Sequence, residues 1–444
     1  MRLLCPRCPT DAVFERGFAR IRRELSVSVE FPEDAATAAA ALAERGPSVP
    51  TGGGPEPRDA REIPFVTIDP AGSMDLDQAY AAERLESGIR VYYAIADLAG
   101  FVSESDPIAG AARRRGVTLY FPDVRALLHP EVLSEGAASL LPGQDRQAIL
   151  WQIDLDADGK PDRVHVERAL VRSREALSYV EAQARIDGGL ADESLALLQP
   201  IGELRQELER QRGAVSLNLP SQEVVRGEGG YELVYDSSLP IEGWNAQVSL
   251  LCGMAAAQLM LDGGVGFLRT LPVRDEREIE RLRRIARALG IEWADDTPYA
   301  ERLRSIRGAS PQEAAFLQQA VTVFRGAGYV EFDGEPPSLH FHGAIAAPYA
   351  HVTAPLRRVG DRYANEVSSW RSPQVASRQR GRAKGSLDFL RYLEMRSGGA
   401  DQPRGRPSIS SRPSCSVIVS ARCLRPRSST CGTTMSAFSC ASRP

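Results

Sequence analysis

Three closely spaced aspartates follow the end of a predicted strand in the segment FVTIDPAGSMDLDQAY (65–80). Asp69 ends the extended run, a Pro-Ala-Gly-Ser turn follows, and Asp75 and Asp77 come next. In an extended chain, side chains at positions i and i+2 point the same way, and the turn can fold Asp69 back toward them. Three neighbouring carboxylates repel one another unless a cation lies among them, and hard oxygen ligands suit Mg²⁺. The alternative is a turn whose aspartates accept hydrogen bonds from backbone N–H groups.

A second group of polar residues lies in the segment YAHVTAPLRRVGDRY (349–363). Pro355 restrains the chain just before Arg357 and Arg358, and His351 precedes all three. Guanidinium groups that are held rigidly make paired contacts with phosphate. In phosphodiester hydrolysis, such an arginine stabilises the charge that grows on the phosphate in the transition state. The alternative is a pair of surface arginines.

A third acidic run imitates a calcium-binding loop. Asp154, Asp156, Asp158 and Gly159 match the start of an EF-hand loop, but its twelfth position is His165 instead of a glutamate. Both flanks also have the β-branched and aromatic composition of strands, whereas an EF-hand needs helices there. This run therefore predicts a hairpin turn.

The composition argues for a cytoplasmic globular protein. Charged residues make up 25% of the 444 residues and the net charge is −4, so there is no overall basic signature of nucleic-acid binding. An RNA-binding protein of this composition must confine its positive charge to a channel. No apolar run approaches the roughly 20 residues of a membrane span, and seven cysteines do not suggest a disulfide framework in the cytosol.

The chain divides into segments of different composition. Residues 1–46 predict a small helical, helix-turn-helix-like module, and residues 47–61 a Gly- and Pro-rich linker. Strand-rich sequence and then helix-rich sequence over 62–370 predict one large α+β domain. A helical extension is expected over 371–399.

The last segment, 400–444, differs from the rest. It is rich in Arg, Ser and Cys, contains neither Lys nor Glu, and has no helical or strand period. One interpretation is a basic RNA-binding tail. The other, which we prefer, is sequence read out of frame, because exposed cysteines suit a cytosolic tail poorly.

Five ordered segments resemble those of a known family, the RNB-type exoribonucleases of the ribonuclease II and ribonuclease R type. The resemblance spans about 62–370 and includes both the acidic segment and the arginine pair. The matching segments are TIDPAGSMDLDQA, IRVYYAIADLAGFV, RRRGVTLYFPD, HPEVLSEGAASLLPGQDRQAILW and HVTAPLRRVGDRY.

The resemblance implies both an activity and roles for individual residues. A mixed sheet-and-helix domain would surround an RNA channel. Single-stranded RNA would be degraded from its 3′ end to nucleoside 5′-monophosphates by a two-metal mechanism with Mg²⁺. Asp69, Asp75 and Asp77 match the metal-site acids, and Arg357 the catalytic arginine. Tyr120 matches the aromatic residue that stacks on the 3′-terminal base; its alternative is a strand-end tyrosine packed on the core.

Beside these residues, we expect Arg358 and His351 to contact the RNA. We expect the protein to act as a monomer in the cytoplasm, with no membrane partner. Two rival functions remain: a non-catalytic RNA-binding relic of the family, and a metal-dependent hydrolase of a small phosphate ester.

The sequence departs from the family pattern at several positions. Gln78 stands where the family has a fourth aspartate, Ala246 and Gln247 replace an acidic pair, and Val359 replaces a tyrosine. The flanking cold-shock and OB-fold RNA-binding domains are not recognisable. An amide oxygen at Gln78 can still ligate Mg²⁺, but it brings no charge. A Gln78→Asp variant is therefore expected to need less Mg²⁺.

Overall fold

The computed structural model describes residues 11–48, 56–215, 221–227, 230–236, 238–308 and 310–370. The predicted extension (371–399) and the tail (400–444) lie outside the described residues, as does most of the predicted linker. Within the described ranges, no helix is both long and apolar enough to cross a membrane.

A seven-stranded mixed sheet forms the centre of the fold, with the strand order β1-β8-β7-β4-β3-β2-β9. Neighbouring strands are antiparallel except at the two edges, where β1 pairs with β8 and β9 with β2 in parallel. The strands are β1 (Arg58–Asp59), β2 (Val66–Asp69), β3 (Gln78–Leu85), β4 (Gly88–Ala96), β7 (Asp145–Leu155), β8 (Pro161–Arg172) and β9 (Glu175–Ser178).

Both faces of this sheet are buried, so its middle strands carry almost continuous apolar runs. Large side chains, among them Tyr80, Tyr93 and Trp151, fill one face. Alanines such as Ala79 and Ala94 occupy the other, where helices approach closely. The composition of each face therefore matches the layer that covers it.

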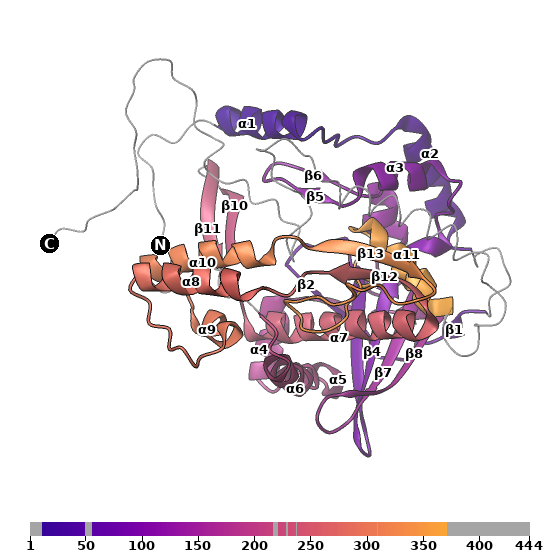
Figure 1. Ribbon diagram of the computed structural model, residues 1–444. Coiled ribbons are helices and arrows are strands. Elements are labelled where there is room, and N and C mark those ends of the chain that lie inside the picture. Colours follow the sequence, from indigo (N-terminus) through magenta and orange to yellow (C-terminus); the bar gives the residue numbers. More distant parts are fainter. Residues whose placement is uncertain are drawn as a thin grey trace.

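Helix α7 (Pro240–Gly263) covers the face with the large side chains and packs against α6 (Leu198–Gln211) (Figure 1). It is apolar on all sides, as expected of a buried helix. A Cβ on Gly253 would lie 2.2 Å from the Tyr349 ring, so only glycine allows this approach. Two shorter helices, α4 (Tyr179–Asp187) and α5 (Glu193–Ala196), complete the layer.

The opposite face is covered by α2 (Glu33–Arg45), α3 (Pro107–Arg115) and the short helices η1 (Leu98–Gly100) and η2 (Val132–Ala137). The other N-terminal helix, α1 (Asp11–Glu24), instead places Phe14 and Phe18 against Tyr231. The two predicted N-terminal helices are thus present. They pack on different parts of the large domain (Figure 1), so they do not form the separate module expected from the sequence.

Smaller elements complete the described fold. Two hairpins are β5 (Leu119–Tyr120) with β6 (Arg125–Ala126), and β10 (Ser221–Gly227) with β11 (Gly230–Asp236). Strand β12 (Val265–Thr270) pairs with β13 (Gly328–Asp333). The remaining helices are α8 (Glu276–Ala288), α9 (Tyr299–Ser305), α10 (Pro311–Ala320), η3 (Val321–Phe324) and α11 (Val359–Trp370).

The predicted α+β class is confirmed, as is the hairpin turn. Strands β7 and β8 are joined through Asp156, whose side chain accepts hydrogen bonds from the backbone N–H groups of Asp158 and Lys160. The predicted linker extends too far, because Arg58–Asp59 already forms the edge strand β1. This pairing was invisible in the sequence because a two-residue strand has no detectable period.

Candidate active site

The three aspartates lie around the turn that joins two neighbouring strands of the sheet. Asp69 is the last residue of β2, and Asp77 comes directly before β3. Antiparallel pairing of Val66 with Tyr80 brings the two strands back alongside each other. Asp75 lies close enough to act on the other two acids, as predicted. Burial is the larger cause, but the charge of Asp75 also raises the pKa of both Asp69 and Asp77.

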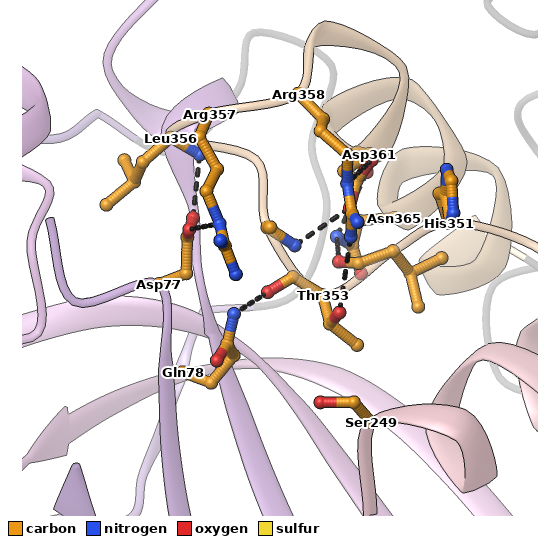
Figure 2. A network of polar contacts seen from close by, with 12 residues as sticks. Asp77, Gln78, Ser249, His351, Thr353, Leu356, Arg357, Arg358, Asp361 and Asn365 are labelled. Carbon is orange, nitrogen blue, oxygen red and sulfur yellow. Dashed lines mark hydrogen bonds and ion pairs between the residues drawn. The ribbon is translucent and has the colours of Figure 1, made fainter. Parts of the chain in front are cut away.

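Asp77 is buried and binds the predicted arginine (Figure 2). Its Oδ2 accepts a hydrogen bond from Arg357 Nε at 3.1 Å, and its Oδ1 accepts one from the Leu356 backbone N–H at 2.8 Å. The Asp77 side chain is 2% exposed, whereas that of Arg357 is 38% exposed. The carboxylate therefore anchors the arginine, whose side chain remains partly exposed.

Burial changes the protonation of these acids. It raises the pKa of Asp69 to about 6, although Arg357 opposes the change. Burial raises the pKa of Asp77 to about 8, again against the attraction of Arg357. A carboxylate whose charged form is disfavoured in this way is stabilised by any further cation that enters the site, and such groups are typical of functional sites.

Tyr120 reaches the acidic cluster from β5. Its hydroxyl donates a hydrogen bond to Asp75 Oδ2 at 3.0 Å, while its ring is only partly buried. The Thr118 N–H donates to the Arg357 carbonyl at 3.0 Å. The tyrosine strand and the arginine segment are therefore fixed to each other, and Tyr120 is not simply a residue of the core.

The other two predicted RNA contacts are held by protein partners. Arg358 makes a multiple contact with Asp361, through Nη2 to Oδ2 at 2.7 Å and Nε to Oδ1 at 3.0 Å. The His351 Nδ1 lies 2.8 Å from the Tyr329 hydroxyl. Burial lowers the pKa of His351 well below its usual value. Both side chains are thus oriented by the protein, and His351 is neutral.

The donor chemistry of the site fits a divalent cation. Carboxylate oxygens are the ligands that Mg²⁺ prefers, and the buried Oδ2 of Asp69 has no hydrogen-bond partner within the described residues. Each Asp77 oxygen retains a second lone pair beside the bond it accepts. As the side chains stand, no group of three or more His, Cys, Asp or Glu among the described residues is arranged to hold a metal ion. The carboxylates would have to draw together around one.

Gln78 is oriented differently from the sequence expectation. Its Nε2 donates a hydrogen bond to the carbonyl oxygen of Thr353, four residues before Arg357 (Figure 2). The amide thus contacts the segment that carries the arginine, a partner 275 positions away in the sequence.

Sequence reasoning missed two groups of residues. Asp361 is fully buried and pairs with Arg358, yet it was not singled out. Burial raises the pKa of Tyr93 and of Tyr179, and the nearby charge of Asp69 adds to the rise in both. Asp97 pairs with Arg168 at 2.7 Å. The sequence offered one signal for Asp361: it lies three residues after Arg358, within reach of an ion pair.

Comparison with known proteins places this arrangement in a family. The RNB domain profile matches residues 57–367. The chain is 25% identical over 332 residues to exosome complex exonuclease RRP44 homolog A of Arabidopsis thaliana, covering 70% of this chain and 35% of that protein.

Solved structures of low sequence identity share the fold. Mycoplasma genitalium RNase R, in complex with ribose-methylated single-stranded RNA, has a TM-score of 0.74 and 20% identity over 87% of this chain and 61% of that one. Yeast Ssd1, described as a pseudonuclease, has a TM-score of 0.62 and 14% identity over 79% of this chain and 45% of that one. The chain spans less than half the length of the curated relatives it matches. From the profile match over most of its length, this chain belongs to the RNB domain family.

Proposed function

We propose that this chain is a 3′-to-5′ exoribonuclease that hydrolyses single-stranded RNA to nucleoside 5′-monophosphates. The observation that supports this most is the pairing of Asp77 with Arg357 beside Asp69 and Asp75. These residues come from opposite ends of the domain. Acids, an arginine and an aromatic side chain at one place are the parts that phosphodiester hydrolysis at a strand end requires.

Asp69, Asp75 and Asp77 would hold Mg²⁺, which when bound supplies Lewis-acid stabilisation of the reacting phosphate and an activated water in a two-metal mechanism. Asp69 supports this assignment with its unpartnered buried oxygen. Asp77 has a second task that needs no metal, because it fixes the Nε edge of Arg357.

Arg357 would stabilise the charge that grows on the phosphate. Its Nε is occupied by Asp77, and its side chain is partly exposed, so the terminal Nη groups would donate to the phosphate. Because the guanidinium is already oriented, little reorganisation is needed when the phosphate arrives. Arg358 and His351 would contact the RNA backbone from the same segment, each held in place by its protein partner.

Tyr120 would support the terminal base by stacking. Its hydroxyl is held by Asp75, so the ring is fixed close to the acids that act on the last phosphodiester. Stacking on an aromatic ring tolerates every base, which suits an enzyme that degrades RNA regardless of sequence. We further propose that the protein acts as a monomer in the cytoplasm.

A second candidate is an RNA-binding protein that has lost catalysis. Gln78 favours it, since this position carries no charge and its amide is engaged with Thr353. Labelled poly(A) incubated with the protein and Mg²⁺ separates the candidates. Release of mononucleotides supports the exoribonuclease, and intact RNA of retarded mobility supports the binding protein.

A further inference from the structure

The segment that carries Arg357, residues 352–358, is here called the arginine loop. Helix α11 holds one side of it. Asp361 Oδ2 accepts a hydrogen bond from the Ala354 N–H at 2.8 Å and also binds Arg358, and Asn365 donates to the Val352 carbonyl. Asp361 and Asn365 are both buried, so this side of the loop is fixed by satisfied interior contacts.

The start of β3 holds the other side through two adjacent residues with opposite roles. Asp77 accepts hydrogen bonds from Leu356 and Arg357, whereas Gln78 donates one to the Thr353 carbonyl. The backbone of Gln78 is paired with Ile95 in the middle of the central sheet. The contact therefore joins the loop to a rigid part of the fold.

The Gln78 contact requires a hydrogen-bond donor at this position. A carbonyl oxygen accepts hydrogen bonds and cannot donate one, so its partner must carry a donor. An amide supplies an N–H, and an ionised carboxylate has none. A carboxylate at position 78 would face the Thr353 carbonyl with like partial charge and would add a further negative charge beside Asp77.

We propose that Gln78 is a positioning residue, whose side-chain amide ties the arginine loop to the central sheet and so holds Arg357 beside Asp77. In this chain, position 78 supplies a donor to the loop and does not replace a metal ligand. The positioning claim rests on the proposed function only where it concerns turnover. The tie between loop and sheet stands on the geometry alone.

Two substitutions separate the roles of donor and ligand. Gln78→Glu and Gln78→Met both remove the donor at similar side-chain length, but only Gln78→Glu adds a carboxylate. The control is Gln152→Glu, the same chemical change at a half-buried position on β7 of the same sheet. Because α11 holds the loop independently, both Gln78 variants should fold.

The first measurement is hydrogen–deuterium exchange of the metal-free protein, read on peptides that cover 352–358. Both Gln78 variants should exchange there roughly tenfold faster than the parent, because a buried carbonyl loses its partner and the loop opens more often. Peptides from α11 should be unchanged, and Gln152→Glu should match the parent throughout. Unchanged exchange in the loop overturns the proposal, whether or not the protein degrades RNA.

The second measurement is hydrolysis of an oligoadenylate at several Mg²⁺ concentrations. Both Gln78 variants should lose roughly 10- to 100-fold in kcat, because a displaced Arg357 no longer meets the phosphate. RNA affinity should stay near that of the parent, and Gln78→Glu should not lower the Mg²⁺ concentration for half-maximal rate. A lower Mg²⁺ requirement, or faster exchange with unchanged turnover, overturns the proposal. A parent without ribonuclease activity refutes the proposed function and leaves the exchange result to decide on the loop.

Discussion

Arg357 Nε lies 3.1 Å from Asp77 Oδ2, although 280 positions separate the two residues in the sequence. The carboxylate is buried and the guanidinium is partly exposed. An ion pair of this kind orients the arginine, and the carboxylate partly neutralises the positive charge of the guanidinium. The pair therefore links the acidic turn and the arginine loop into one unit, and each half depends on the other.

Removing either member of the Asp77–Arg357 pair should strongly reduce catalysis with little loss of RNA binding. Asp77→Asn and Arg357→Ala should each reduce kcat by at least about 100-fold, since both residues act mainly in the transition state. The measurements are single-turnover hydrolysis and RNA binding in parallel. Asp162→Asn, an exposed change on β8, is the control. A variant that loses affinity and rate in equal proportion would show a ground-state role instead.

Two substitutions at Tyr120 should separate the ring from the hydroxyl. Tyr120→Ala should weaken binding of short RNA ends by roughly 1–3 kcal/mol of lost stacking. Tyr120→Phe keeps the ring and loses only the hydrogen bond to Asp75, so it should bind nearly as the parent does. The measurements are RNA affinity and the length of the final product. If Tyr120→Ala changes neither, the stacking role is wrong.

Asp69 should report on the divalent ion without any need for activity. Mg²⁺ should raise the melting temperature of the parent, and Asp69→Asn should remove most of that rise, because its buried oxygen has no other partner. Without Mg²⁺ at pH 8, Asp69→Asn should be the more stable protein, since burial disfavours the charged carboxylate. The same Mg²⁺-dependent rise in both proteins would remove Asp69 from the site.

His129 should make the protein sensitive to acid. It is 1% exposed, and burial, with Arg362 nearby, lowers its pKa from 6.5 to about 3. Below pH 6.5 the unfolded chain binds a proton that the folded protein does not, so stability falls as the pH falls toward 3. His129→Leu should therefore gain about 2 kcal/mol relative to the parent between pH 7 and pH 5. Denaturant unfolding at both pH values measures this, and a pH-independent difference between the two proteins would contradict it.

The sequence located the acidic turn because Asp69, Asp75 and Asp77 are close in the chain and their spacing has a direct geometric meaning. It also predicted that helix-rich sequence follows the strands, and the helices α7 and α8 lie in that part of the chain. The strands β10 to β13 were missed, since short strands beside helices show little period.

The partners within the site could not be read from the sequence. Gln78 was interpreted as a possible metal ligand because it stands where the resembling family has a fourth aspartate, whereas in the structure its amide donates to Thr353. Likewise, α2 was assigned to a separate module, although its Ala35 and Ala39 belong to the core on one face of the central sheet. Both errors concern contacts across long sequence separations, which no local pattern records. A carboxylate at position 78 is therefore no longer expected to lower the Mg²⁺ requirement.

The most direct test of the proposed activity follows a 5′-labelled single-stranded RNA during incubation with the protein and Mg²⁺. A 3′-to-5′ exoribonuclease should shorten the labelled strand progressively and release nucleoside 5′-monophosphates, and a chelator should stop the reaction. Release of a 5′-labelled mononucleotide at the earliest time, or RNA that stays intact although bound, would contradict the account.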